Sequence, residues 1–580
     1  MKGLRIDLIK KYLKPHRKAL LFGAISLLLV NMLSVTIPME IRRIIDELKD
    51  GFTINEVFTE SIWIIVLATA MGLIRLFSRQ IVFGVGRQVE VDIRQRLFDH
   101  MIGQDPSWVQ ELGTGEVIAR STSDIENIRR LLGFAVLSLT NTFLAYSFTI
   151  PAMLAIDPLM TIASISLYPL MLGIVGLFGG KMVSQRKRQQ EALSSLSALI
   201  QEDLSGISAI KIYGQEKSEQ KAFSKLNNNY RDSAIRLART ASTLFPLLQG
   251  ISSISLLLLI AIGSGRLESE TLTIGGLVAL ILYVERLVFP TALLGFTLNT
   301  FQLGQVSLER VEELFNRKPI IRDPKFPISF QKQPSGKLEA RNLTFKYDGS
   351  KRDILKDLSF SINPGELVAL VGPVGSGKTT LARAIGRMIE IKEGQLFLDD
   401  LDIVKIKLKD LRGNIALVPQ EGYLFTNSLL ENLRFGNPQA SREKVEESAY
   451  QAKLIDDIKG FPSGFDTLVG ERGITLSGGQ RQRTALGRAL LITAPLIVLD
   501  DALASVDNKT AAGIIASIRN QTKSTVLIIS HQLSAAAACD RILVIDEGKL
   551  VQEGVHSELI QENGLYKSLW EREKAVEKIK

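Results

Sequence analysis

The sequence predicts a multidomain chain, in which an all-α domain of six membrane-spanning helices is followed by an α/β domain with a helical subdomain. The first half holds six apolar runs, each long enough to cross a bilayer. The second half alternates apolar strands with helix patterns, which is typical of a parallel sheet. Hydrophobic residues make up 46% of the 580 residues and charged residues 23%, so the two characters must be segregated along the chain. The single cysteine, Cys539, excludes a disulfide within the chain.

The start of the chain is basic and amphipathic. Between residues 4 and 18, apolar side chains share one helical face and the lysines lie largely elsewhere. We expect an interfacial helix on an anionic membrane surface; the alternative is a basic tail without membrane contact. The net charge of +9 fits the flanks of membrane spans better than binding to nucleic acid. The apolar face consists of Leu4, Leu8, Ile9, Tyr12 and Leu13.

Two polar stretches, residues 84–131 and 183–242, separate the apolar runs and are too long for unstructured loops. We expect helical arms with tips at Asp105–Trp108 and Tyr213–Glu216. Lysine and arginine are abundant in the arms and at the N-terminus, so the positive-inside rule places these parts and the second half in the cytoplasm. This topology fits a multi-pass protein of a bacterial inner membrane; an organelle membrane is the alternative. The spans are expected at residues 20–41, 60–83, 132–156, 159–182, 243–263 and 272–296.

Three charged residues fall inside the predicted spans, where charges are costly and often functional. Arg75 lies in the second span, and Glu285 and Arg286 lie in the sixth. Neighbours on a helix point about 100° apart, so Glu285 and Arg286 cannot face the same way. We expect at least one of the three to face a wet central cavity that binds substrate; the alternative is a structural pair of Arg75 with Glu285. Small-residue spacing in the fourth span predicts close helix packing at Gly173, Gly176, Gly179 and Gly180.

The second half contains a phosphate-binding loop. A buried strand at 367–371 runs into the pattern G-x-x-x-x-G-K-[ST], and a helix follows, as this loop requires. Its backbone N–H groups and the helix N-terminus suit phosphates. Lys378 adds a positive charge, and the Thr379 hydroxyl suits Mg²⁺. The predicted phosphate site consists of Gly372, Pro373, Val374, Gly375, Ser376, Gly377, Lys378, Thr379 and Thr380.

Two further strands end in polar residues that should reach the same sheet edge. The apolar run 496–499 ends in Asp500, which is placed to hold Mg²⁺, and in Asp501, the candidate to orient or deprotonate the attacking water. His531 follows the run 525–529, and we expect it to contact the γ-phosphate rather than to be structural. The candidate catalytic groups are therefore Asp501 and His531.

With these motifs in order, the second half resembles the ATPase domain of ATP-binding-cassette (ABC) transporters. Residues 476–480, LSGGQ, resemble that family's signature loop, and residues 467–473 resemble the segment that precedes it in exporters. The resemblance implies that Gln420 takes part in catalysis and in holding Mg²⁺ together with Thr379 and Asp500, that Tyr347 stacks on adenine, and that Asp507 belongs to the D-loop. It implies that the signature acts on ATP held by a partner chain, through Leu476, Ser477, Gly478, Gly479 and Gln480.

Six spans fused to one ATPase domain resemble an ABC exporter half-transporter, most like the heterodimeric multidrug halves. ATP and Mg²⁺ are then the cofactors, and a second half-transporter, membrane lipids and an amphiphilic substrate are the partners; nucleic acid is not expected. On this interpretation the P-loop NTPase fold begins after a proline-rich linker. The expected boundaries are 1–18 for the interfacial helix, 19–315 for the transmembrane domain, 316–337 for the linker, 338–572 for the ATPase domain and 573–580 for a charged tail.

One position departs from the family pattern, because Asp501 stands where the family has Glu. The carboxylate is one methylene shorter and lies roughly 1.5 Å further from the water, whereas a general base must come within about 2.6–3.2 Å. We therefore expect the site on this chain to bind ATP well and to hydrolyse it slowly, which favours a heterodimer with a partner that carries Glu. The alternative is a homodimer that tolerates Asp.

The predicted function is ATP-driven export of an amphiphilic drug-like compound or lipid. An acid such as Glu285 in the cavity would favour cationic amphiphiles. A membrane-bound ATP-dependent regulator or channel is the alternative that would share both halves of the chain. A soluble cassette ATPase would share only the second half, and the six apolar runs argue against it.

Overall fold

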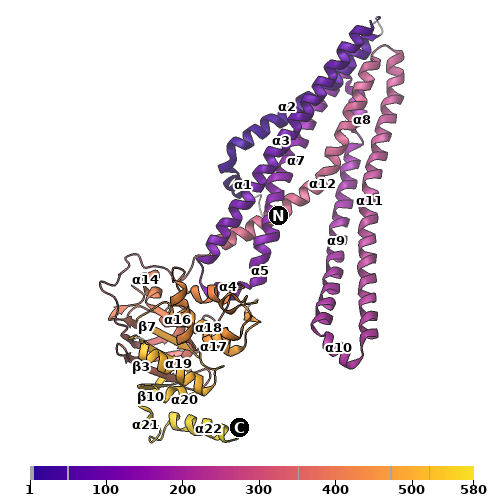
Figure 1. Cartoon of the computed structure of the whole chain (residues 1–580). Coiled ribbons are helices and arrows are strands. Elements are labelled where there is room, and N and C mark those ends of the chain that lie inside the picture. The colour runs from indigo at the N-terminus through magenta and orange to yellow at the C-terminus, as the bar shows by residue number, and fades with distance from the viewer. Residues whose placement is uncertain are drawn as a thin grey trace. The chain divides into compact units, whose positions relative to one another are not determined.

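The computed structural model describes residues 6–48, 51, 53–350, 352–470, 473–521 and 523–579. The chain forms two compact units (Figure 1). The first unit comprises residues 1–104 and 108–318, and the second comprises residues 105–107 and 319–580. Two segments of the sequence interpretation, Leu4 and the pair Glu471 and Arg472, lie outside the described residues.

The described residues of the first unit form helices and no strands, as the sequence predicted for this half of the chain. In the described part of the chain, six helical stretches are long and apolar enough to cross a membrane. The third combines several shorter helices, and the fourth combines two. The six stretches are Asp7–Glu47, Ile54–Ile102, Thr114–Ile156, Pro158–Ser205, Glu216–Glu268 and Ile274–Asn316.

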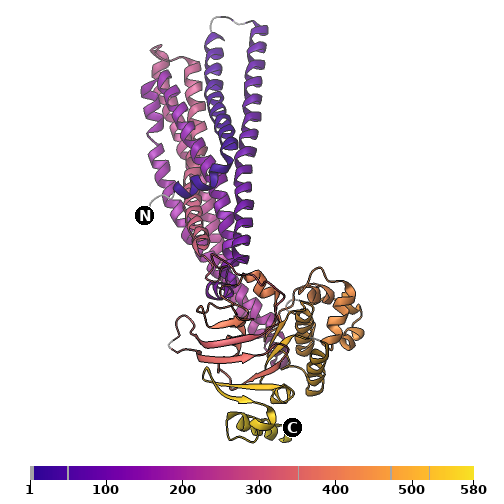
Figure 2. The same ribbon diagram turned by 90° about the vertical axis from the view of Figure 1, so that its left-hand side faces the viewer.

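Most of these helices pack in pairs. Helix α2 (Arg17–Glu47) runs beside α3 (Ile54–Ile102), and α9 (Tyr168–Ser205) runs beside α11 (Glu216–Glu268) (Figure 2). Helix α12 (Ile274–Asn316) packs against members of both pairs. Its buried side chains follow one another along nearly its whole length, so it forms the centre of the unit. The remaining helices here are α1 (Ile6–Leu13), η1 (Lys14–His16), α4 (Pro106–Leu112), α5 (Thr114–Ala119), α6 (Ile125–Arg130), α7 (Val136–Ile156), α8 (Pro158–Ile165) and α10 (Ile207–Tyr213).

The predicted arms are helical, as expected. Helix α3 continues well beyond its apolar part, and the turn at the second tip lies between α10 and α11, where Gly214 adopts a left-handed φ of 61°. At the first tip the short helices α4 and α5 follow instead of a simple turn. The fourth span is broken at residues 166–167, between α8 and α9, next to Pro169. Proline lacks the N–H that would continue the helical hydrogen bonds, which explains the break.

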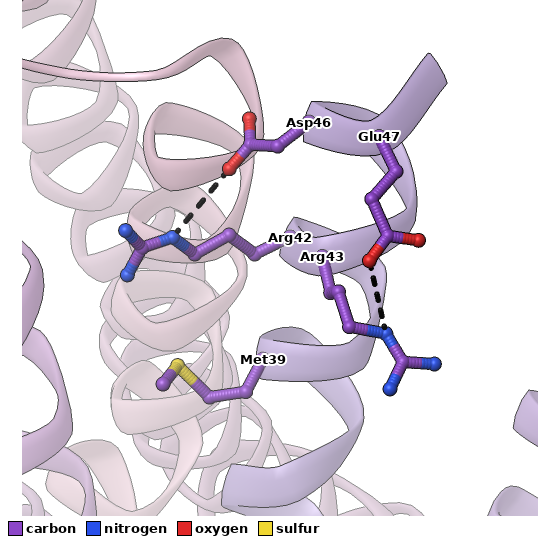
Figure 3. A pocket seen from close by; sticks show the side chains of 5 residues that line it. All are labelled: Met39, Arg42, Arg43, Asp46 and Glu47. Atoms are coloured by element: carbon purple, nitrogen blue, oxygen red, sulfur yellow. Dashed lines mark ion pairs between the residues drawn. The ribbon is translucent and has the colours of Figure 1, made fainter. Parts of the chain in front are cut away.

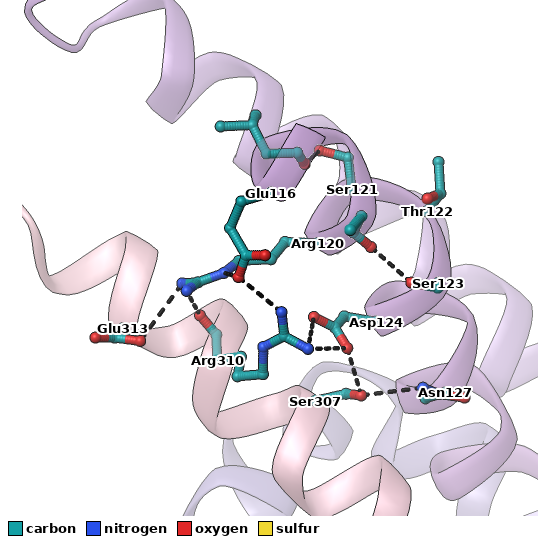
Figure 4. A network of polar contacts seen from close by, with 12 residues as sticks. Glu116, Arg120, Ser121, Thr122, Ser123, Asp124, Asn127, Ser307, Arg310 and Glu313 are labelled. Atoms are coloured by element: carbon teal, nitrogen blue, oxygen red, sulfur yellow. Dashed lines mark hydrogen bonds and ion pairs between the residues drawn. The ribbon is translucent and has the colours of Figure 1, made fainter. Parts of the chain in front are cut away.

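Two π-helical turns interrupt the third span, η3 (Arg120–Asp124) and η4 (Leu131–Ala135). A polar network joins η3 to α12 (Figure 4). Asp124 is 4% exposed, and its carboxylate accepts a hydrogen bond from Ser307 at 2.7 Å and pairs with Arg310 at 3.3 Å. Arg310 also donates to Glu116 at 2.7 Å. The buried carboxylate thus has a cation and a hydroxyl as partners, which offsets its loss of hydration.

At the other end of α12, an acidic side chain of α2 holds the start of the helix. Asp46 accepts hydrogen bonds from the backbone N–H of Gly275 at 2.8 Å and from the Thr273 hydroxyl at 2.7 Å. Arg42 pairs with the same carboxylate across a shallow pocket (Figure 3). A Cβ on Gly275 would lie 2.3 Å from the Arg42 carbonyl oxygen, so only glycine fits there. Asp46 therefore joins Arg42 of α2 to the start of α12.

The predicted close packing at Gly173, Gly176, Gly179 and Gly180 is wrong within this chain. A Cβ at any of the four would meet no described atom within 4 Å. Other glycines of this unit do allow a neighbouring helix to pack closely against them. A Cβ on Gly304 of α12 would lie 2.4 Å from Leu131 Cβ of η4, and one on Gly23 would lie 2.7 Å from Val82. Among the described glycines, close approach therefore occurs at glycines of α12 and α2, one of which, Gly295, faces Val175 of α9, rather than at the four glycines of α9.

The second unit contains a six-stranded sheet of order β10-β9-β3-β8-β7-β6 and a four-stranded antiparallel sheet of order β2-β1-β4-β5. In the larger sheet β6, β7, β8, β3 and β9 are parallel. All five residues of β7 (Leu496–Asp500) are buried. Ile497 and Leu499 join one apolar cluster and Leu496 and Val498 join the other, so this strand is covered on both faces, as the apolar run predicted.

The elements of the second unit follow in chain order. The strands are β1 (Leu338–Phe345), β2 (Leu355–Ile362), β3 (Leu367–Val371), β4 (Leu396–Leu398), β5 (Leu401–Asp402), β6 (Ile415–Val418), β7 (Leu496–Asp500), β8 (Thr525–Ile529), β9 (Arg541–Asp546) and β10 (Lys549–Gly554). The helices are α13 (Lys378–Ile385), α14 (Leu408–Gly413), α15 (Leu429–Arg434), α16 (Arg442–Gln451), α17 (Ile455–Gly460), η5 (Gly464–Asp466), α18 (Gly478–Leu490), α19 (Asn508–Gln521), α20 (Leu533–Ala536), α21 (His556–Leu559) and α22 (Leu565–Ile579).

Candidate active site

The loop between β3 and α13 has the backbone of an anion cradle. Gly375 and Gly377 have φ of 85° and 102°, values that residues with a side chain rarely adopt. A Cβ on Gly372 would lie 2.0 Å from the carbonyl oxygen of Ile545, and one on Gly377 would lie 2.9 Å from that of Ile354. The glycines are therefore needed both for the turn and for the close approach of neighbouring strands. The loop ends at the N-terminus of α13, whose dipole favours an anion.

Lys378, the first residue of α13, is 5% exposed and folds back over the loop. Its ammonium group donates to the carbonyl oxygens of Gly372 at 2.8 Å and Pro373 at 2.7 Å. Burial lowers the pKa of Lys378, and the nearby carboxylates of Asp501 and Asp500 oppose that shift. The cation is thus held inside the cradle by neutral oxygens, which a phosphate group can replace with a charge-assisted interaction.

Thr379 and Asp500 come together from α13 and β7. The Thr379 hydroxyl donates to Asp500 Oδ1 at 3.2 Å, and Asp500 is 4% exposed. Burial raises the pKa of Asp500, while the Thr379 hydrogen bond lowers it. A hydroxyl and a carboxylate are oxygen ligands of the kind that Mg²⁺ takes beside nucleotide phosphates. The residues present therefore fit a magnesium–nucleotide complex.

Asp501 lies one residue past the end of β7 in a left-handed conformation, with φ of 52°. Its N–H donates to the carbonyl oxygen of Ile529 at 2.8 Å. Its own carboxylate accepts from the backbone N–H of His531 at 3.4 Å. The structure thus brings Asp501 and His531 together at the ends of β7 and β8, as the strand pattern predicted. The contact uses the histidine backbone, and the imidazole is exposed.

Three further residues were predicted to act at the ATP site: Tyr347, Gln420 and Asp507. Tyr347 lies near the cradle, because its hydroxyl is 3.3 Å from the Thr380 hydroxyl and its ring packs edge-to-face on Phe345. Gln420, just after β6, is exposed. Asp507 caps the start of α19 by accepting from the Thr510 N–H, and this hydrogen bond lowers the pKa of its carboxyl.

The signature residues begin helix α18. Ser477 is the N-cap, and its hydroxyl accepts from the Gln480 N–H at 3.2 Å while the Gln480 side chain accepts from the Ser477 N–H at 2.9 Å. A Cβ on Gly479 would lie 2.8 Å from the Ser505 carbonyl oxygen. The glycine is thus required for packing inside this chain, in addition to any role toward an anion. Leu476 is buried and Gly478 opens the helix.

Sequence reasoning missed one connecting side chain. Gln482 of α18 donates to the carbonyl oxygen of Asp501 at 3.4 Å, and its oxygen accepts from the Ser505 N–H at 2.9 Å. One amide therefore links the signature helix to the loop that follows β7. The only sequence signal was its place two residues after the signature, on a helix whose orientation the sequence does not specify.

In the first unit, a cavity of about 510 Å³ lies among α2, α3, α7 and α12, and we call it the arginine cavity. Arg75 of α3 and Arg286 of α12 line it, together with Arg79, which the sequence reasoning did not select. Glu285 does not line it and is exposed, which corrects the expectation of an acid in the cavity. On α12 the two neighbours point about 100° apart, and packing turns the arginine inward. Arg75 and Glu285 form no ion pair in the described structure.

Comparisons with known proteins match both halves. The family model described as ABC transporter transmembrane region matches residues 20–291, and the model described as ABC transporter matches residues 355–504. YheI of Bacillus subtilis, a probable multidrug resistance ABC transporter ATP-binding/permease protein, is 32% identical over 95% of this chain and 94% of its own length.

Two further proteins are similar over most of the chain. An ATP-dependent lipid A-core flippase of Aromatoleum aromaticum is 31% identical over 87% of this chain and 84% of its own length. The solved structure of a bacterial Atm1-family ABC exporter with ATP bound has a TM-score of 0.79 at 26% identity, and the match covers 96% of this chain and 99% of that one.

Proposed function

This chain belongs to the ABC transporter family, and on that premise we propose that it exports an amphiphilic drug-like compound or lipid as one half of a dimeric transporter. It is a multi-pass integral membrane protein whose ATP hydrolysis is coupled to transport. Exporters of this fold work as dimers. The observation that carries the proposal is the fusion of six spanning helices to one complete phosphate cradle.

The residues of the cradle have distinct tasks in this proposal. Residues Gly372 to Thr380 wrap the phosphates with backbone N–H groups, and Lys378 exchanges its carbonyl partners for phosphate oxygens. Thr379, Asp500 and Gln420 would hold Mg²⁺, which neutralises charge on the phosphates when bound. Tyr347 would lie against the adenine, and His531 would contact the γ-phosphate. Leu476 to Gln480 would face the ATP of the partner chain, with the N-terminus of α18 as the anion-binding end.

We further propose that the site on this chain hydrolyses ATP slowly. The Asp501 carboxylate already accepts from the His531 N–H at 3.4 Å and has one methylene fewer than the family's Glu with which to reach a water. Small misplacements of a catalytic group can cost about a hundredfold in rate. This favours a heterodimer, in which the intact signature of this chain completes a faster site on a partner that carries Glu. A homodimer that works with Asp is the alternative.

The proposed orientation has the N-terminus, both arms and the ATPase unit in the cytoplasm, because lysine and arginine concentrate in those parts. The arm tips at Asp105–Trp108 and Tyr213–Glu216 would pass closure of the ATPase units to the spanning helices. A membrane-bound regulator or channel would share this architecture, so the decisive test is transport itself.

The test uses inside-out vesicles that contain the full chain, and it follows uptake of a fluorescent amphiphilic lipid or dye. We expect uptake to require ATP and to stop in Lys378→Ala, which lacks the phosphate-binding cation. Lys392→Ala, a change of the same kind outside the cradle, serves as the control. Uptake that proceeds equally without ATP, or with ATP in the Lys378 variant, would indicate a channel and contradict export.

A further inference from the structure

All the charged side chains that line the arginine cavity are positive. Its lining contains Arg75, Arg79 and Arg286 and no aspartate or glutamate. Within the described part of the chain, none of the three arginines forms an ion pair. Other arginines of the same unit are paired: Arg120 with Glu116, and Arg310 with Asp124. The cavity is thus a place in the apolar part of the bundle where three arginines have no acidic partner among the described residues.

Arg286 is fixed in place but has an unused donor. Its Nη2 donates to Asn31 Oδ1 at 3.0 Å, and the Asn31 amide donates to Asn141 Oδ1 at 3.2 Å. Its Nη1 is buried and makes no hydrogen bond to any described residue. Buried polar groups are almost always hydrogen-bonded, so a donor without a partner calls for an explanation. The neutral amides orient the guanidinium without neutralising it, and they leave part of its fork free for a ligand.

The rest of the cavity is apolar and aromatic. Phe83, Phe134, Phe289 and Leu293 line it beside the arginines. Phe134 comes from the π-helical turn η4, and Phe289 and Leu293 lie one and two turns beyond Arg286 on α12. A ligand that suits this lining has an acyl or aromatic body and one compact charged end. A guanidinium suits planar or tetrahedral oxyanions such as carboxylate and phosphate, because its fork donates two parallel hydrogen bonds.

We propose that the arginine cavity binds an amphiphile with an anionic phosphate or carboxylate headgroup, and that this class is the transported substrate. The inference rests on the proposed export function. It replaces the cationic amphiphile expected from Glu285, which lies outside the cavity. Arg286 and Arg75 take the headgroup, Arg79 adds positive charge, and the phenylalanines take the apolar body. A cationic amphiphile would meet three like charges, which disfavours it.

The test measures equilibrium binding of radiolabelled dodecyl phosphate to the full chain in phosphatidylcholine nanodiscs, with empty nanodiscs subtracted. Dodecyltrimethylammonium and inorganic phosphate serve as competitors. We expect dodecyl phosphate to bind at least about tenfold more tightly than the ammonium compound, and inorganic phosphate not to displace it, because the free anion lacks the apolar body. Arg286→Gln should weaken dodecyl phosphate binding about tenfold, the typical value of a charge-assisted hydrogen bond. Arg286→Lys, which keeps the charge, should lose less.

The matched control is Arg231→Gln, which removes an exposed arginine of α11 that pairs only with its neighbour Asp232 in the described structure. It should bind dodecyl phosphate as the unmodified chain does. Ammonium binding as tight as phosphate binding in the unmodified chain would overturn the proposal, whatever the variants do. Unchanged phosphate binding in Arg286→Gln would also overturn it. Failure of ATP-driven uptake with phosphate binding intact would instead contradict the export function and leave the anion site standing.

Discussion

At the scale of single residues, position 501 combines two constraints. Its φ of 52° lies in the left-handed region, which aspartate tolerates better than most residues. Its carboxylate is tied to the end of β8 through the His531 N–H. A longer side chain at this position could extend past that hydrogen bond toward the cradle. With Asp at position 501 instead of the family's Glu, the carboxylate reaches less far toward the cradle, while strand β7 keeps its conformation.

We predict that Asp501→Glu raises the ATPase rate of the purified chain by at least about tenfold, because a glutamate restores the reach of a general base. Release of inorganic phosphate at saturating ATP measures the effect. Asp466→Glu, the same added methylene at an exposed carboxylate of η5, should leave the rate unchanged. A purified homodimer that already turns over rapidly and gains nothing from Asp501→Glu would contradict the idea of a degenerate site.

Cys539 yields a second prediction at this scale. The thiol is 9% exposed, and burial raises its pKa to about 12. A raised thiol pKa means that almost none of the reactive thiolate exists at pH 8 in the folded chain, and that the fraction grows only as the pH approaches 12. We expect iodoacetamide at pH 8 to leave the native protein unlabelled and to label it fully in denaturant, as measured by intact mass. Rapid labelling of the native chain would show that this part of the core opens readily.

At the scale of elements, the two π-helical turns place the third span against α12. The sequence predicts the third span at 132–156, inside the helical stretch Thr114–Ile156, but it could not reveal η3 and η4, because π-turns have no strong signal in local propensity. Likewise it identified Arg286 and Glu285 as candidates, and only the packing of α12 determines which one faces inward. By contrast, the phosphate loop was predictable in detail, because its glycines are required by local backbone geometry and its lysine and threonine by phosphate and Mg²⁺ chemistry.

The contact between η4 and α12 can be tested at Gly304. A Cβ there would lie 2.4 Å from Leu131 Cβ and 3.0 Å from the Asn127 carbonyl oxygen. We predict that Gly304→Ala destabilises the folded chain by about 1–3 kcal/mol, the usual cost of overpacking. Thermal unfolding in detergent, followed by tryptophan fluorescence, measures the change. Gly265→Ala in α11, where a Cβ meets nothing within 4 Å, should be neutral or stabilising. Equal midpoints for the two variants would show that η4 and α12 do not pack this closely.

At the scale of the whole molecule, the described part of the chain carries six helical stretches able to span a membrane and one cradle. In the proposed arrangement its signature helix acts on the partner's site rather than on its own. The fold class, the phosphate loop and the signature could be predicted from the sequence, because each has a motif or an apolar length that is nearly diagnostic. The charge of the cavity could not, because it depends on side chains from four helices that meet only in the folded bundle.

We predict that nanodiscs holding a single copy of the chain bind ATP but do not hydrolyse it, since in the proposed arrangement each site needs a signature loop from a second chain. Discs of larger diameter that hold two copies should show ATPase activity, if only at the slow rate expected for Asp501. Binding of a fluorescent ATP analogue and phosphate release would be measured on both preparations, with Lys378→Ala as the variant that binds nothing. ATPase activity per chain that is equal in one-copy and two-copy discs would contradict the requirement for a partner.

The amide of Gln482 has a consequence for how the chain evolves. It joins the helix that begins with the signature to the Asp501 carbonyl and the Ser505 N–H. If the signature serves the partner's nucleotide, selection on the partner's site also preserves the loop beside this chain's own carboxylate. The side chain at 501 is then free to drift while its backbone is not. Asymmetry between two related halves can accumulate by this route one residue at a time, without either half losing its shape.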